Sequence, residues 1–210
     1  MTAAGAPASS ARAGRQRRVI VGISGASGAI YGIRLLEELR AHGVAVHLVM
    51  TKAAERTIAE ETDRSLAEIR ALADECHPIQ NIGASIASGS FRVDGMAVAP
   101  CSIRTVGAIA GCLADNLLTR AADVMLKERR RLILLVRETP LHVGHLKAMT
   151  AAAESGAIIM PPVPAFYTRP TKLEDIINHT VGRMLDLLDL DHELLQRWDG
   201  HAVRNSDRGD

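Results

Sequence analysis

Residues 19–28 read VIVGISGASG, and this stretch decides the fold of the chain. Its apolar half predicts a buried strand, and the small residues that follow predict a tight loop that opens a helix. Such a helix start offers unpaired backbone N–H groups and a positive dipole end to an anion. A tight strand-to-helix turn that binds nothing is the alternative.

A second informative stretch, residues 126–140, reads LKERRRLILLVRETP. Its apolar part predicts a buried strand that ends abruptly in Arg137 and Glu138. Ligands of open α/β sheets sit outside the carboxyl ends of the strands. We therefore expect one pocket in which a phosphate-binding loop lies beside a paired cation and carboxylate. A plain surface ion pair is the alternative for these two side chains.

Strand and helix patterns alternate along the rest of the chain. Strands are expected at 18–23, 44–50, 95–99, 132–136 and 157–160, and helices at 28–42, from 51, at 65–75, from 103, and at 120–130, 141–155 and 175–188; residues 76–93 read as irregular. These repeated β-α units predict a single-domain Rossmann-like or flavodoxin-like α/β fold, with a parallel sheet and helices on both faces. We expect this domain at 17–198, between a disordered tail at 1–16 and a flexible tail at 199–210.

Composition narrows the function. The 210 residues fit one domain, and a formal net charge of +1 gives no reason to propose nucleic acid or an anionic membrane surface as a partner. Three cysteines without a CxxC pair suit a reducing cytosol, so we expect a cytoplasmic protein. No apolar run approaches the length of a membrane span.

The ligand is expected to be a mononucleotide. The glycines of the first loop are not spaced as G-x-G-x-x-G, and the second strand ends in Met50 and Thr51, where a dinucleotide fold needs an acidic residue for the ribose. No GK[ST] follows, which excludes a nucleoside triphosphatase loop. NAD is therefore disfavoured.

A second helix start, PCSIRT at 100–105, repeats the arrangement at another strand end. Its hydroxyl and N–H groups suit a phosphate or ribityl oxygens, although Ser102 could simply be an N-cap. Cys101 is expected to be a small buried residue rather than a nucleophile. His142 and His145 are spaced i,i+3 but have no evident third ligand, which favours solvent-facing helix histidines over a metal site.

Taken together, ten short motifs closely resemble the UbiX-type flavin prenyltransferases, flavin-binding proteins of the flavodoxin-like α/β class. They lie in family order over about residues 18–198: GISGASG at 22–28, TKAA at 51–54, ETD at 61–63, ASGSF at 87–91, PCSIRT at 100–105, RAADV at 120–124, LKERR at 126–130, RETPL at 137–141, PPVPAFY at 161–167 and RW at 197–198.

The resemblance implies an enzyme that joins a dimethylallyl group from dimethylallyl monophosphate to reduced FMN. Bonds form at the flavin N5 and C6 atoms, and the product, prenylated FMN, serves a UbiD-type decarboxylase. The resemblance also implies a reaction without a metal. It further implies a homo-oligomer, commonly a dodecamer, with active sites at subunit interfaces.

By position, the resemblance assigns roles to single residues. Contacts to FMN are implied for Gly25, Ala26, Ser27, Thr51, Ser102, Ile103, Arg104, Thr105 and Arg137. Contacts to the prenyl phosphate are implied for Lys127, Tyr167 and Arg183, with Arg120 nearby. Glu138 and Glu61 are the candidates for proton handling. Arg183 also falls on or near the apolar stripe of the last helix, where a charge needs an anionic partner.

Two other functions stay open. One is an FMN-dependent decarboxylase of the cysteine type, which would share the FMN site; its Asn-containing motif is absent from PCSIRT at 100–105. The other is a flavin carrier without catalytic activity, in which Lys127, Glu138 and Arg183 would have no clear task.

Overall fold

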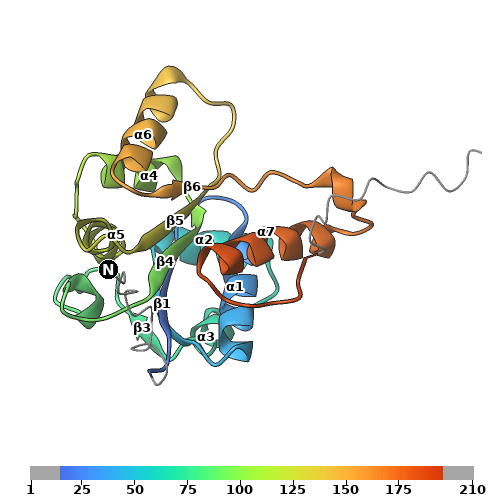
Figure 1. Ribbon diagram of the computed structural model, residues 1–210, viewed down its shortest axis with the longest axis horizontal. Coiled ribbons are helices and arrows are strands. Elements are labelled where there is room, and N and C mark those ends of the chain that lie inside the picture. The colour runs from blue at the N-terminus through green and yellow to red at the C-terminus, as the bar shows by residue number, and fades with distance from the viewer. Residues whose placement is uncertain (1–14, 196–210) are drawn as a thin grey trace, which may run out of the picture.

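The computed structural model describes residues 15–195, and its centre is one parallel sheet of six strands in the order β3-β2-β1-β4-β5-β6 (Figure 1). The strands are β1 Arg18–Ile23, β2 Ala45–Met50, β3 Glu75–His77, β4 Gly95–Cys101, β5 Arg131–Val136 and β6 Ile158–Ile159. All five pairings are parallel, as expected from the repeated β-α units. This confirms the predicted flavodoxin-like fold.

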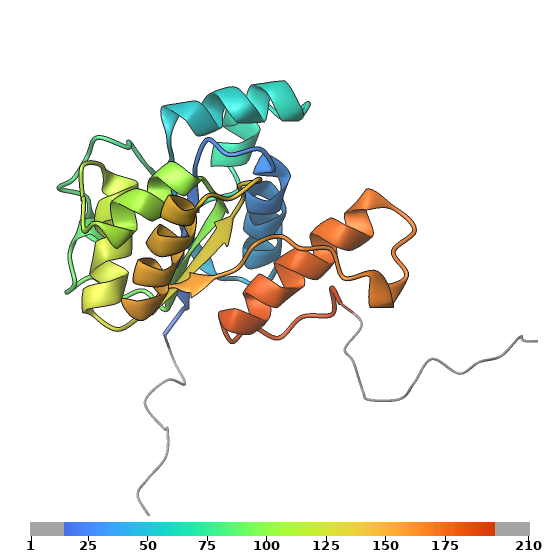
Figure 2. The same ribbon diagram turned by 90° about the horizontal axis from the view of Figure 1, so that it is seen from above.

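Helices cover both faces of the sheet (Figure 2). They are α1 Ala29–Ala41, α2 Lys52–Glu61, α3 Leu66–Arg70, α4 Ile103–Ala110, α5 Leu117–Lys127, α6 Val143–Glu154 and α7 Leu173–Leu187, with short 3₁₀ turns η1 Ser85–Ala87 and η2 Phe166–Thr168. One core lies under α1 and α7, and the other lies under α4 and α5. Because alternate strand residues point to opposite faces, Val19 and Val21 enter the first core and Ile20 the second.

Two predicted elements differ from the structure at the edge strand. The helix expected at 65–75 starts with the capping box of Ser65 and Glu68 but already ends at Arg70, because Ile69 is the one buried residue that holds it to the core. The chain then forms β3 within the region that reads as irregular. A strand of three residues is too short for its alternation to show in the sequence.

Two further boundaries shift next to the candidate site. Strand β4 continues through Pro100, and its register slips between Val98 and Cys101, where the missing N–H of proline is tolerated. Helix α5 begins at Leu117 instead of Arg120, because the Asn116 side chain accepts a hydrogen bond from Thr119 N and caps the helix.

The domain begins earlier than expected. Arg15 makes a 2.8 Å ion pair with Asp94, and the Gln16 side chain donates to Gly43 O, although both residues belong to the predicted tail. Residues 1–14 and 196–210 lie outside the described residues, so the rest of both predicted tails and the RW motif are not described. Within 15–195, no helix is both long and apolar enough to cross a bilayer.

Candidate active site

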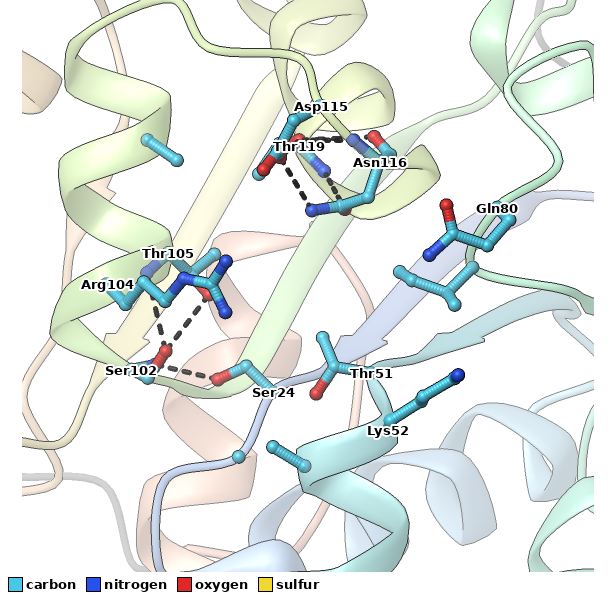
Figure 3. A pocket seen from close by; sticks show the side chains of 14 residues that line it. Ser24, Thr51, Lys52, Gln80, Ser102, Arg104, Thr105, Asp115, Asn116 and Thr119 are labelled. Atoms are coloured by element: carbon cyan, nitrogen blue, oxygen red, sulfur yellow. Dashed lines mark hydrogen bonds between the residues drawn. The ribbon is translucent and has the colours of Figure 1, made fainter.

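A cavity of about 450 Å³ opens at the carboxyl edge of the sheet, where β1, β2 and β4 end (Figure 3). Its lining residues are Ser24, Gly25, Thr51, Lys52, Ala53, Ile79, Gln80, Ser102, Arg104, Thr105, Ala108, Asp115, Asn116 and Thr119. The structure therefore brings five predicted FMN residues to one cavity: Gly25, Thr51, Ser102, Arg104 and Thr105. Its volume lies in the range of small-molecule sites.

Buried Ser24 fixes the floor of this cavity. Its hydroxyl donates to Pro100 O at 2.8 Å and accepts from Ser102 N at 2.7 Å. The ends of β1 and β4 are thus bonded to each other through one side chain. A ligand at this edge meets a floor that is already ordered.

Gly25 lets the loop after β1 approach helix α2. A Cβ atom built on Gly25 would lie 2.3 Å from the Cβ of Ala53 and 3.1 Å from its carbonyl carbon. Any larger side chain would push loop and helix apart. The glycine is required here by close packing rather than by a left-handed backbone.

Two helix starts face the cavity. Thr51 caps α2, since its hydroxyl accepts from Ala54 N at 3.0 Å. Ser102 caps α4 in the same way: its hydroxyl accepts from Thr105 N at 3.3 Å and lies 3.0 Å from the Thr105 hydroxyl. Both helices therefore direct the positive ends of their dipoles to one space.

The charges of the wall suit an anion. Lys52 and Arg104 carry positive charge, and neither forms an ion pair with any residue of the described chain. The carboxylate of Asp115 is engaged at the start of α5, where it accepts from Asn116 Nδ2 at 2.8 Å and from Thr119 Oγ1 at 3.2 Å. Hydroxyl groups, two helix starts and two cations form the donor set that a mononucleotide phosphate requires. The residues present thus fit FMN.

Glu61 occupies the start of helix α1. Its carboxylate accepts from Gly28 N at 2.8 Å and from Ala29 N at 3.1 Å. Burial raises the pKa of Glu61, but hydrogen bonds from Ser27, Gly28 and Ala29 and the charge of Arg137 outweigh burial and bring the pKa below its ordinary value. A phosphate at this helix start would have to compete with Glu61, and neither Ala26 nor Ser27 lines the cavity.

Arg137 and Glu138 follow the end of β5, at the same sheet edge. Arg137 N donates to Cys101 O at 3.0 Å, and its exposed side chain lies near enough to Glu61 to lower that pKa. Glu138 is half-buried and accepts from its neighbour Thr139 N at 3.0 Å. Neither side chain lines the cavity, as is also true of Ile103.

The predicted prenyl phosphate residues lie elsewhere. Lys127 ends α5, whose N-cap Asn116 lines the cavity, so the 11-residue helix separates them by about 16 Å. Lys127 Nζ pairs with Glu128 at 2.8 Å and lies beside Gly89, where a Cβ would be 2.9 Å from it. Arg120, one turn into α5, pairs with Asp123 at 2.7 Å.

Tyr167 and Arg183 lie on the segment that projects from the body in Figure 1 and on the helix that follows it. The Tyr167 hydroxyl is 3.2 Å from His179 Nε2 on α7. Arg183 is exposed and pairs with Asp186 at 2.7 Å on the same helix. The expectation that Arg183 sits on the apolar stripe is wrong, because that stripe is formed by Ile177, Val181, Met184 and Leu185.

Sequence reasoning missed five cavity residues: Lys52, Gln80, Asp115, Asn116 and Thr119. The spacing of Asn116 and Thr119 is a capping signal that predicts a helix start, and a third helix start near the cavity could have been inferred from it. Cys101 is fully buried as expected, and burial raises the pKa of its thiol.

Comparisons with known proteins agree with this site. A family model described as Flavoprotein matches residues 7–196. The flavin prenyltransferase UbiX of Thauera aromatica is 58% identical over 187 residues, which cover 89% of this chain and 96% of the relative.

Two solved structures have the same fold. AnUbiX in complex with FMN and dimethylallyl pyrophosphate has a TM-score of 0.88 at 52% identity and covers 90% of this chain and 100% of its own. A dodecameric FMN-dependent UbiX-like decarboxylase from Escherichia coli O157:H7 has a TM-score of 0.85 at 47% identity, over 87% of this chain and 100% of its own.

Proposed function

Because this chain belongs to the Flavoprotein family and, within it, to the UbiX-type flavin prenyltransferases, we propose that it transfers a dimethylallyl group from dimethylallyl monophosphate to N5 and C6 of reduced FMN. The product, prenylated FMN, passes to a UbiD-type decarboxylase. The observation that carries this proposal is the cavity at the carboxyl edge, where two helix starts and two unpaired cations meet.

FMN would be held by the groups that line this cavity. The starts of α2 and α4, with Lys52 and Arg104, would bind its phosphate, and the hydroxyls of Thr51 and Thr105 suit its ribityl oxygens. Gly25 keeps the loop close enough to α2 to shape that space. Reduced flavin supplies the two nucleophilic atoms of the reaction.

The prenyl phosphate would be held where subunits meet. Lys127, Arg120, Tyr167 and Arg183 all lie on outer surfaces, away from the cavity of their own chain. The projecting segment exposes 71% of Val163, 72% of Phe166 and 69% of Leu173, an apolar surface that a neighbouring subunit would cover. A homo-oligomer such as the dodecamer described for the E. coli relative would bring these residues to a neighbour's cavity.

The chemistry asked of these residues is electrostatic. Cleavage of an allylic phosphate leaves negative charge on the departing oxygens, and cations together with a tyrosine hydroxyl stabilise that charge as it develops. These groups replace a divalent cation, so we propose a metal-independent reaction. Turnover that stops with EDTA and returns with magnesium would contradict it.

Glu138 and Glu61 would handle protons in different ways. Glu61 is a carboxylate at neutral pH, since its pKa is lowered, and it can accept a proton or orient Ser27 but cannot donate one. Glu138, held by a single backbone hydrogen bond, is the better candidate for exchanging a proton with the phosphate or the flavin.

The test is anaerobic incubation with reduced FMN and dimethylallyl monophosphate, followed by mass spectrometry of the flavin and a phosphate assay. We expect a flavin heavier by one isoprenoid unit and one phosphate released per turnover. Carbon dioxide release from a cysteine-terminated peptide would instead identify the decarboxylase, and tight FMN binding without product would identify the carrier.

A further inference from the structure

Three side chains of the edge strand β3 and its neighbour β2 form a cluster away from the cavity: His47, Glu75 and His77. His47 lies opposite Glu75 in the parallel register, and His77 follows Glu75 by two residues. Because strand residues alternate in direction, all three side chains lie on one face of the sheet. In the chain, 28 residues separate the first from the other two, so no short motif reveals the cluster.

The ligand atoms converge closely. His47 Nδ1 lies 2.9 Å from His77 Nε2, and the Glu75 carboxylate lies 3.4 Å from His47 Nδ1 and 3.5 Å from His77 Nδ1. The histidine side chains are only 6% and 3% exposed, whereas Glu75 is 55% exposed. The cluster is therefore built into the protein on the histidine side and open to solvent on the glutamate side.

The chemistry of this cluster matches a transition metal ion. Two imidazoles and one carboxylate are a known ligand set for Zn²⁺, and tetrahedral Zn–N bonds of about 2.0–2.1 Å place two nitrogens about 3.3 Å apart. The observed 2.9 Å needs only a small opening of the ring pair. Burial lowers the pKa of His47 and of His77, which keeps both rings in the neutral form that binds metal.

The surroundings hold the site in place. The edge of Phe91 packs against the His47 ring at 5.1 Å and 82° between planes, and the Arg18 guanidinium lies 5.2 Å from the centre of Phe91. Arg18 opposes a bound cation, but the carboxylates of Glu75 and Asp74, which both act on His47, more than balance it.

We propose that His47, Glu75 and His77 bind one first-row divalent cation, Zn²⁺ by preference, and leave one coordination position to water. The ion ties the three-residue edge strand β3 to β2. It also steadies Ile79 and Gln80, which follow His77 closely and line the cavity. His47 lies four residues before Thr51, about 13 Å along the strand, so this ion takes no part in prenyl transfer.

The test uses the full chain without a histidine tag, stripped of metal by a chelator and titrated at neutral pH with Zn²⁺ by calorimetry and with Co²⁺ by visible absorption. We expect one ion per chain, tetrahedral Co²⁺ bands, and a higher melting temperature with Zn²⁺. Glu75→Gln should weaken binding at least tenfold, and His77→Gln should remove the Co²⁺ bands. Affinity should fall as the pH is lowered, because protons compete for the imidazoles.

His42→Gln is the matched control, since His42 lies 4.0 Å from Glu38 and likewise forms a histidine–carboxylate pair without a third ligand. Its Zn²⁺ affinity should equal that of the wild type. Glu75 is exposed, so Glu75→Gln keeps its fold and its flavin binding even if His77→Gln does not. Absence of stoichiometric binding in the wild type, or equal affinity in wild type and Glu75→Gln, would overturn the proposal.

Discussion

Replacing Gly25 with alanine tests whether close packing of the first loop shapes the flavin cavity. The added Cβ would lie 2.3 Å from Ala53 Cβ, and ordinary contacts begin at 3.4 Å, so loop and helix must separate by about 1 Å. Overpacking of this kind costs about 1–3 kcal/mol. Both partners are cavity walls, so much of that strain should appear in ligand binding. We expect the Kd for FMN to rise about tenfold, which corresponds to about 1.4 kcal/mol.

The assay is titration of FMN by its fluorescence, with thermal melting of each variant in parallel. Gly43→Ala is the control, because Gly43 has φ +65° and no atom within 4 Å of an added Cβ. That substitution strains only the backbone and should lower stability by about 1 kcal/mol without changing FMN affinity.

A second substitution isolates the contact. Ala53→Gly removes the methyl group that Gly25→Ala would meet, so the double variant should recover part of the lost affinity, and the two changes should be non-additive. Wild-type FMN affinity in Gly25→Ala, or strict additivity in the double variant, would refute the reasoning.

Three further predictions concern the acidic residues and the assembly. The folded-state pKa of Glu61 is lowered, so its cap stabilises the protein above the ordinary value of 4.5 and that stability is lost as the pH falls below it; melting curves of Glu61→Gln should lack this acid-dependent loss. Glu138→Gln should bind FMN normally but turn over about a hundredfold more slowly in single-turnover assays, and a wild-type rate would remove Glu138 from the chemistry. Lys127→Ala and Glu138→Gln chains, each defective alone, should regain activity when refolded together, because a mixed assembly contains sites with both native residues; no recovery would place both residues in one chain's site.

The fold and the carboxyl edge could be predicted because the signals there are local. Each apolar run that ends in small or hydroxyl residues marks a strand followed by a helix start, and Ser24, Thr51 and Ser102 follow this pattern. Edge strand β3 could not be predicted, since its three residues are stabilised mainly by pairing with β2, a contact far away in the sequence.

The residues that the site gained and lost have a common physical reason. Gln80 and Asp115 enter the cavity from loops whose path depends on the packing of β3 and α5, which no periodicity reports. The prenyl phosphate residues Lys127 and Arg183 leave it because family resemblance assigns residues to a site in an assembly, whereas one chain supplies only parts of each site.

Helix α5 gives this division a mechanical basis. Its buried face is fixed to the sheet by Leu117, Ala121 and Met125, so the helix is a rigid connection between the cavity at Asn116 and the surface at Lys127. If Lys127 serves a neighbour's cavity, each α5 joins one flavin site to the next phosphate site. FMN binding then requires a single chain, whereas prenyl transfer requires the assembly, and substitutions that loosen α5 should affect both ends together.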